Sequence, residues 1–385
     1  MSQRRISNGL SHLLGSLRAV EPRVRPVVLP LSLTVSALVV ACSPAREDLR
    51  AEVLDGIVQY CIVDEHEALA EESASLVAAV DALCEAPSDA TLETARAAWW
   101  SMRRPWRERK ALPWGPLVDD GIDTQLDFWP ARPTSVEGGI DSGTTTLAEL
   151  ELLGVASVGL PAIEYLLWDG SAAATPRPPL EALADAQRCA YLSLLARDVD
   201  VRLADLQTNE TEFVGTVRNA GNNDRFPTLA RAVDELLNAL IGGLHDLDET
   251  ALAKPYGLEA GTLADPALAE SRFSARSAQD VRDAVLIVEV IYLGPPLDGD
   301  DVRALGLGDL VAQASPEIDA EVRAQLQTVR DRTNALSESL VDASGVVDPS
   351  VPALWVELEA LRALLTADVA SALGVTVSLT DNDGD

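Results

Sequence analysis

The sequence predicts an all-α protein, and three observations support this prediction. Apolar residues recur at steps of three and four between residues 47 and 375, which is the spacing of one helix face. No long stretch over the same span alternates between apolar and polar residues, as a half-buried strand would. Alanine and leucine abound, whereas aromatic residues make up only 4% of the 385 residues. We therefore expect helical bundles and no sheet.

The helices can be justified in chain order. The helical pattern begins at residue 47, and if the first helix is one straight helix it spans residues 47–84. Residues 228–247 then carry a wide apolar face that must pack on other helices. That face consists of Leu229, Val233, Leu236, Leu237, Leu240, Ile241, Leu244 and Leu247.

Two further helices are predicted near the end of the chain. Ser315, Pro316 and Glu317 combine an N-cap, a first-turn proline and an acidic residue that favours the helix dipole. Residues 351–373 repeat the apolar pattern, and Gly374 supplies a stop signal.

Proline, glycine, asparagine and aspartate gather in segments that we expect to break the helices. These segments are residues 111–145, 170–179, 207–227, 255–266 and 294–308. The first is long enough that we expect structure within it. We place a domain boundary at the third segment, which gives helical domains at 42–206 and 207–385 with a cleft between them. A weak echo between residues 163–166 (IEYL) and 288–291 (VEVI) suggests an internal duplication.

Composition excludes several classes of function. The chain has 61 acidic and 30 basic residues, a formal charge of −31, which argues against a nucleic-acid partner. At 47% hydrophobic residues it is an ordinary globular chain rather than a disordered acidic one. Three histidines and four cysteines exclude a site that needs many such ligands.

The first 41 residues are typical of a bacterial lipoprotein signal peptide. Five arginines against one glutamate precede an apolar run over residues 27–41, which is too short for a comfortable membrane span. Residues 38–43 (LVVACS) resemble a lipobox, so we expect Cys42 to carry the lipid that attaches the protein to the membrane. Ser43 after it favours the outer membrane, facing the periplasm. A plain secretory signal or an N-terminal anchor is the alternative.

Cleavage before Cys42 would leave Cys61, Cys84 and Cys189 in an oxidising compartment, and one disulfide plus one free thiol is the simplest arrangement. In one straight helix, Cys61 and Cys84 would lie roughly 35 Å apart and could not bond. A break in that helix would reopen the question.

Four separated segments, taken together, resemble the imelysin-like family of exported bacterial proteins, and they occur in the family's order. The most specific is residues 159–168 (GLPAIEYLLW), which is similar to the family signature G-x-H-A-I-E-[YF]-L-L-W. The others are residues 95–99 (ARAAW) with 114–116 (WGP) and 129–130 (WP), residues 270–274 (ESRFS) with 292–294 (YLG) and 306–310 (GLGDL), and residues 373–376 (LGVT) with 383–385 (DGD).

The resemblance implies two bundle-like helical domains with the signature helix at the cleft between them. It also implies an envelope protein that is commonly linked to iron acquisition. The family takes its name from a reported insulin-cleaving metallopeptidase, although many members look like binding proteins.

Two departures from the family pattern affect the expected site. Pro161 stands where the signature has histidine, and Lys110 stands where the first motif has glutamate. Proline cannot bind a metal and lacks a backbone donor, so it is tolerable only in a first helical turn or at a kink. Lys110 adds a positive charge, and we expect it to pair with Glu164 if both face the cleft.

Carboxylates are then the only plentiful ligands, and they suit hard cations such as Ca²⁺, Mn²⁺ or ferric iron. Glu164 is the best single candidate for a metal ligand, with iron or calcium as the candidate ion. The alternative is a buried glutamate satisfied by arginine or backbone donors. Glu270, Ser271 and Ser274 are further ligand candidates, or else a capping cluster for the helix that follows.

Other chemical signals are weak. The chain has no H-E-x-x-H motif. We expect His66 to lie on a solvated charged face and His245 to mark a helix end. Trp99, Trp100 and Trp106 are expected in the core, and the acidic residues 381–385 are expected to be a solvated tail.

The sequence thus predicts an imelysin-like envelope lipoprotein that binds a ligand linked to iron or other metal acquisition. It would have a degenerate metal site, no catalytic residues and no peptidase activity, and its partners would include other envelope proteins of iron acquisition. Two alternatives remain, a metallopeptidase with a carboxylate site and a non-catalytic scaffold at the outer membrane.

Overall fold

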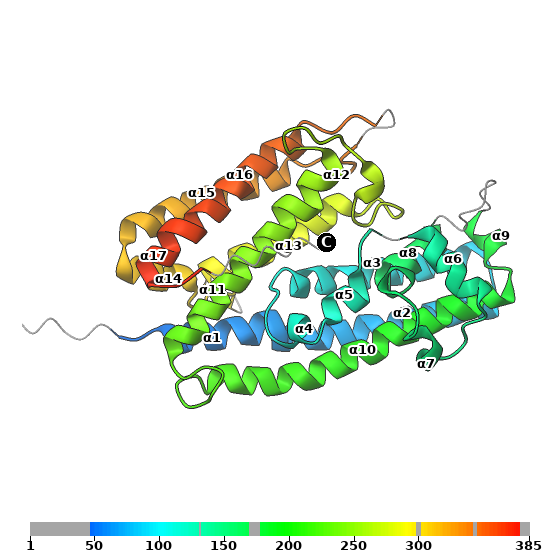
Figure 1. The fold of residues 1–385 in the computed structure, drawn as a ribbon, viewed down its shortest axis with the longest axis horizontal. Coiled ribbons are helices and arrows are strands. Elements are labelled where there is room, and N and C mark those ends of the chain that lie inside the picture. Colours follow the sequence, from blue (N-terminus) through cyan, green and yellow to red (C-terminus); the bar gives the residue numbers. More distant parts are fainter. Residues whose placement is uncertain (1–46, 131, 169–177, 298–301, 342–344, 378–385) are drawn as a thin grey trace, which may run out of the picture. The chain divides into compact units, whose positions relative to one another are not determined.

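The computed structural model describes residues 47–130, 132–168, 178–297, 302–341 and 345–377. The predicted signal peptide, Cys42 and the acidic residues 381–385 lie outside these residues. Within them the chain is all-α, as predicted, and the only β-type pairs are two isolated bridges (Figure 1). No described helix is both long enough and apolar enough to cross a membrane.

The elements follow one another with mostly short connections. The α-helices are α1 (Arg50–Val58), α2 (Glu65–Glu85), α3 (Asp89–Lys110), α4 (Pro116–Asp119), α5 (Ile122–Asp127), α6 (Pro133–Asp141), α7 (Leu147–Leu150), α8 (Gly159–Trp168), α9 (Pro179–Ala182), α10 (Ala186–Arg218), α11 (Leu229–His245), α12 (Lys254–Tyr256), α13 (Ser277–Leu293), α14 (Leu307–Ala314), α15 (Pro316–Asn334), α16 (Ser350–Leu364) and α17 (Ala370–Leu373). Three π-helical segments, η1 (Gln59–Asp64), η3 (Asp246–Ala253) and η5 (Leu365–Val369), continue α1, α11 and α16, and η2 (Val155–Ser157) and η4 (Pro266–Leu268) are 3₁₀ turns.

The predicted helices at 228–247, 315–329 and 351–373 correspond to α11, α15 and the α16–α17 run, and Gly374 ends the last in the left-handed conformation. Residues 111–145 contain α4, α5 and α6, so the expected long break does carry structure. The break expected from residue 207 begins later, because α10 continues to Arg218. The residue-207 boundary therefore falls inside a helix, and the division into two domains stays a prediction.

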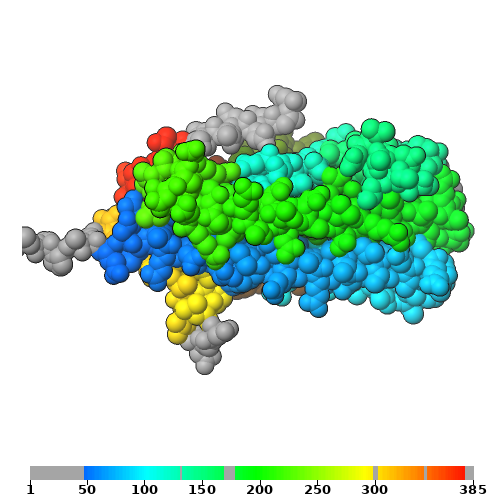
Figure 2. Space-filling model, turned by 90° about the horizontal axis from the view of Figure 1, so that it is seen from below, coloured from blue at the N-terminus to red at the C-terminus, as the bar shows by residue number. Residues whose placement is uncertain are grey.

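Buried apolar residues form two clusters. One gathers around α11, α13, α15 and α16, and the other around α2, α3, α8 and the first part of α10. The α1–η1–α2 run and α10 each contribute residues to both clusters. These two runs lie side by side, blue and green in Figure 2. Trp99 and Trp106 are core residues as expected, but Trp100 is 37% exposed.

One disulfide joins Cys84 at the end of α2 to Cys189 near the start of α10. Cys61 is a buried free thiol in η1, and burial raises its pKa to about 12. The π-helical segment η1 interrupts the helix over 47–84, yet Cys61 and Cys84 do not bond to each other.

Candidate functional site

The signature helix α8 begins at a backbone position that suits only glycine. Gly159 has φ +76°, and a Cβ atom there would lie 2.3 Å from the carbonyl oxygen of Leu126 at the end of α5. One residue later, Trp99 of α3 donates its indole N–H to the carbonyl of Leu160 at 3.0 Å. Contacts with α3 and α5 therefore fix the start of α8.

Pro161 occupies the first turn of α8, which is the position where a helix tolerates proline. The first backbone N–H groups of a helix have no partner within it, so the missing donor costs little there. Pro161 and Glu164, one turn apart, line the same small pocket. Pro161 thus leaves the helix intact, and it offers no nitrogen atom that could bind a metal at this position.

Glu164 is buried and held by Ser274. Its Oε1 accepts hydrogen bonds from the backbone N–H of Ser274 at 2.8 Å and from its hydroxyl at 2.7 Å. Burial raises the pKa of Glu164 to about 7, although both bonds from Ser274 act in the opposite direction. The backbone donor fits the alternative view of Glu164 as a buried, satisfied acid.

The segment before α13 has an unusual backbone. Ser271 and Ala275 adopt positive φ values of 48° and 58°, which non-glycine residues rarely do. Ser274 also donates to the carbonyl of Ser271, and the hydroxyl of Ser271 donates to Asp280. No side chain caps the start of α13, so the two serines are not a capping cluster for that helix. Ser271 lines the pocket, and Ser274 contacts Glu164. Such conformations cost energy and often lie at functional sites.

Arg103 is the central charge of the pocket. This buried guanidinium donates to Asp127 and to Glu270, each at 2.6 Å, and its Nε lies 3.5 Å from Asp280. Arg107 adds a second contact to Glu270 at 3.2 Å. The carboxylates around Arg103 are therefore already paired.

Lys110 does not form the expected pair with Glu164. Its ammonium donates to Asp127 at 2.9 Å and lies 4.0 Å from Glu270. The expectation fails because the end of α3 faces the end of α5, where Asp127 is the nearest acid. Burial alone would raise the pKa of Asp127, but the charges of Arg103 and Lys110 hold it well below its usual range.

The pocket itself is small. Its internal volume, about 10 Å³ open to the centre of a water molecule, is the room that one water or one small ion needs. Of the residues that the sequence singled out, Pro161, Glu164, Glu270 and Ser271 line it. Ser274 and Lys110 contact its lining residues, so the six positions converge.

Sequence reasoning missed the residues that define the pocket's charge. Arg103 and Asp127 lie in none of the motif segments. The one available signal was their helical spacing: Arg103 lies four residues after Trp99 and four before Arg107, on one face of α3.

This pocket does not offer a metal-ligand set. In the described part of the chain, only His245, Asp248 and Glu249 place three ligand atoms within 4.8 Å of one another. The pocket contains no histidine, and the Arg103 guanidinium lies among Asp127, Glu270 and Asp280. Glu164 as a metal ligand remains a prediction that this arrangement does not favour.

The two described histidines differ in environment. His66 is buried and contacts Glu210, which also pairs with Arg109, so its expected place on a solvated face is wrong. The reason is that this side of α2 packs on α10. His245 is the last residue of α11, as predicted, and its side chain is 46% exposed.

Comparisons with known proteins give one consistent family. The family model named Imelysin matches residues 62–368. Iron-regulated protein A of Synechococcus elongatus is 26% identical over 313 residues, which cover 80% of this chain and 81% of that protein.

Two solved structures share the fold. One is an iron-regulated protein A precursor from Parabacteroides distasonis, with a TM-score of 0.67, 18% identity and coverage of 86% of this chain and 95% of that one. The other is an imelysin-like protein from Psychrobacter arcticum, with a TM-score of 0.65, 16% identity and coverage of 86% and 98%.

Proposed function

Because the chain belongs to the imelysin family, we propose that it is an exported, lipid-anchored binding protein of iron or other metal acquisition that does not cleave peptides. The link to iron is supported by the relatives named iron-regulated protein A. The absence of peptidase activity is argued from the pocket at α8.

The ion-paired pocket is the observation that carries this proposal. A zinc peptidase needs three protein ligands, an open coordination position and usually a glutamate base. Here Pro161 replaces a nitrogen ligand, and Arg103 pairs with the carboxylates that could replace it. The pocket also has room for about one water molecule, which is far too little for an extended peptide. We therefore regard the metal site at α8 as degenerate.

Export and lipid attachment rest on the N-terminal sequence, with Cys42 as the attachment residue. The Cys84–Cys189 disulfide supports an oxidising compartment, because such bonds are rare in the reducing cytosol. The proposed location is the bacterial envelope, on the outer membrane and facing the periplasm, where other iron-acquisition proteins would be its partners. Metabolic labelling with a fatty acid tests the anchor: Cys42→Ala should abolish incorporation, and labelling that persists would refute it.

Proteolysis of an unfolded substrate tests the non-enzymatic role. The purified protein, with and without added Zn²⁺, should leave denatured casein intact over hours. Glu164→Gln serves as the matched variant, because it keeps the Oε1 acceptor for Ser274 and removes the ionisable group. Cleavage that a chelator stops and that Glu164→Gln abolishes would overturn the proposal in favour of a carboxylate-based peptidase.

Restoring the signature histidine tests the degenerate site. Pro161→His returns a nitrogen ligand one turn before Glu164, so we expect it to raise the affinity for Zn²⁺ or Fe²⁺ at this pocket at least tenfold. Pro161→Ala is the control, because it removes proline without adding a ligand. Equal metal content of the two variants by elemental analysis would show that the pocket is not a former metal site.

A further inference from the structure

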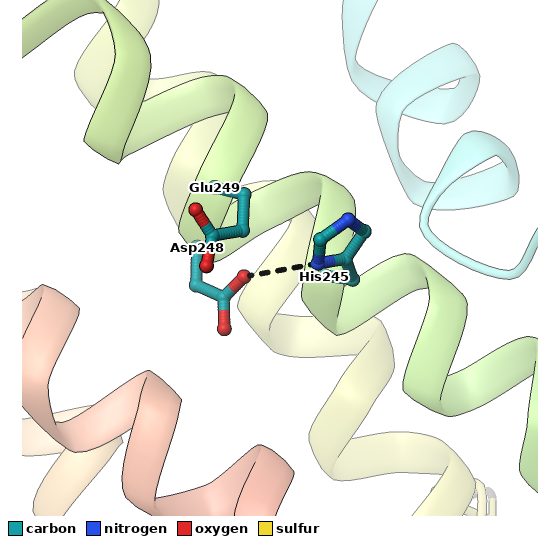
Figure 3. A group of neighbouring side chains, drawn as sticks. All are labelled: His245, Asp248 and Glu249. Atoms are coloured by element: carbon teal, nitrogen blue, oxygen red, sulfur yellow. Dashed lines mark ion pairs between the residues drawn. The ribbon is translucent and has the colours of Figure 1, made fainter. Parts of the chain in front are cut away.

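A second group of potential ligands lies at the end of α11, away from the signature helix. His245 is the last α-helical residue, and Asp248 and Glu249 follow in the π-helical segment η3. Residues three and four apart share a helix face, so the three side chains gather on one side, as Figure 3 shows. The Nδ1 atom of His245 and Oδ1 of Asp248 are 4.0 Å apart.

Asp248 provides an independent sign of a missing ligand. The residue is fully buried, and its Oδ1 atom, the one that faces His245, has no hydrogen-bond partner. Its other oxygen accepts a hydrogen bond from Arg362 at 2.6 Å. A buried carboxylate oxygen without a partner is costly and rare, so a group that binds it is expected.

The surrounding charges favour a cation as that group. Arg362 is shared between Asp248 and Glu249, with its Nη2 atom 3.4 Å from Glu249. Beyond this pair, Glu259 lies near Glu249 and Glu359 lies near Asp248, and each adds a negative charge to the surroundings. Arg362 pairs with only Asp248 and Glu249, so a bound cation would reduce the repulsion among these acids.

From this geometry we propose that His245, Asp248 and Glu249 bind one divalent first-row transition metal ion. Imidazole nitrogen with carboxylate oxygen suits Zn²⁺, Mn²⁺ or Fe²⁺, whereas Ca²⁺ prefers oxygen ligands alone. Ligand atoms about 2.0–2.2 Å from one ion lie roughly 3–4 Å apart, so the present spacing within 4.8 Å needs only small side-chain rotations. The exposed His245 side chain has that freedom, and solvent supplies the remaining position.

This site is independent of the pocket at α8. None of its three ligands lines that pocket, and Pro161 does not affect it. It therefore gives the chain a route to metal binding that the loss of the signature histidine leaves untouched, whether or not the proposed function holds.

Metal titration tests the proposal with the full chain purified in detergent and stripped with a chelator. Zn²⁺ is followed by calorimetry, and Co²⁺ is followed by its visible absorption, which reports nitrogen and oxygen coordination. We expect one equivalent to bind, and His245→Gln to weaken binding at least tenfold. Because His245 is exposed, this variant should fold normally, which circular dichroism checks.

Two controls make the result specific. Glu321→Gln removes an exposed acid on α15 and should bind the metal as the wild type does. Glu164→Gln should also bind normally, because the pocket at α8 is a different site. The proposal would be overturned if the wild-type protein bound no Zn²⁺ or Co²⁺. It would also be overturned if His245→Gln bound the metal as tightly as Glu321→Gln.

Discussion

Arg103 decides at the level of one residue what the pocket at α8 can accept. Its guanidinium lies against three acids that come from α5, from the segment before α13 and from α13 itself. Without a positive charge there, these acids would repel one another in a place that water barely reaches. The same positive charge opposes the binding of a metal cation in this pocket.

Replacement of Arg103 should therefore be costly. We expect Arg103→Met to lower the free energy of unfolding by about 3–5 kcal/mol, because it leaves buried carboxylates unpaired. Arg197→Met is the control, since its pair with Asp81 is exposed and should contribute less than about 1 kcal/mol. Urea denaturation of both variants measures the difference, and similar losses would contradict the central role of Arg103.

Glu164 should make stability depend on pH in a defined direction. Its pKa rises from a usual value of 4.5 to about 7 on folding, so between these values the folded state holds a proton that the unfolded state has lost. Stability must then fall as pH rises from about 4.5 to 7, by up to about 3 kcal/mol.

The comparison with Glu164→Gln isolates this effect, because the variant cannot titrate at that position. Denaturation at pH 5 and at pH 7.5 should show that the wild type loses more stability than Glu164→Gln over this interval. Parallel pH profiles for the two proteins would mean that the burial of Glu164 does not perturb its ionisation.

Single residues also show the limit of sequence reasoning. Glu164, Glu270 and Ser271 could be predicted because they lie in recognisable motifs, and the structure brings them together. Arg103 could not, because its partners are 24 to 177 residues away in the chain and no local pattern identifies them. The Lys110–Glu164 pair and the exposed His66 fail for the same reason: partner choice depends on tertiary packing.

The helix α8 positions Pro161 and Glu164 in the pocket, and Gly159 allows this helix to begin close to the end of α5. Gly159→Ala would place a methyl group against the carbonyl of Leu126 and force a positive φ on alanine. We expect a loss of about 2 kcal/mol or more in the free energy of unfolding.

Gly154→Ala is the matched control five residues earlier. Gly154 has φ −69°, and a Cβ atom there meets nothing within 4 Å, so this change should be nearly neutral. Thermal unfolding of the two variants checks the contrast. A Gly159→Ala protein as stable as Gly154→Ala would show that α8 can shift without penalty.

The long helices were predictable, but their ends and irregularities were not. The apolar faces of α11, α15 and α16 are evident in the sequence because burial there repeats at helical spacing. The continuation of α10 through Thr208, Asn209 and Thr211 was missed because these residues have low helix propensity. Packing of Leu206 and Phe213 outweighs that preference, and both threonines donate to the carbonyls four residues before them.

At the scale of the whole molecule, the Cys84–Cys189 bond should contribute measurably to stability. It closes a loop across a sequence separation of 105 residues, which restricts the unfolded chain. The Cys84→Ser, Cys189→Ser double variant should lose about 2–5 kcal/mol. Dithiothreitol should lower the stability of the wild type to a similar level and leave the double variant unchanged. No effect of reductant on the wild type would argue against the bond.

The two helical runs shared by both cores bear on how a ligand could enter. Proteins that close like a hinge usually bend at loop residues, whereas here α10 extends for 33 residues, about 50 Å, without interruption. Bending between the cores would have to break α10 and the α1–η1–α2 run together. Exchange of water or a ligand at Glu164 should therefore proceed through local displacement of the irregular segment 269–275, of which residues 269–273 line the pocket. In mechanical terms, the long helices would stay rigid while the segment that contains the strained residues Ser271 and Ala275 moves.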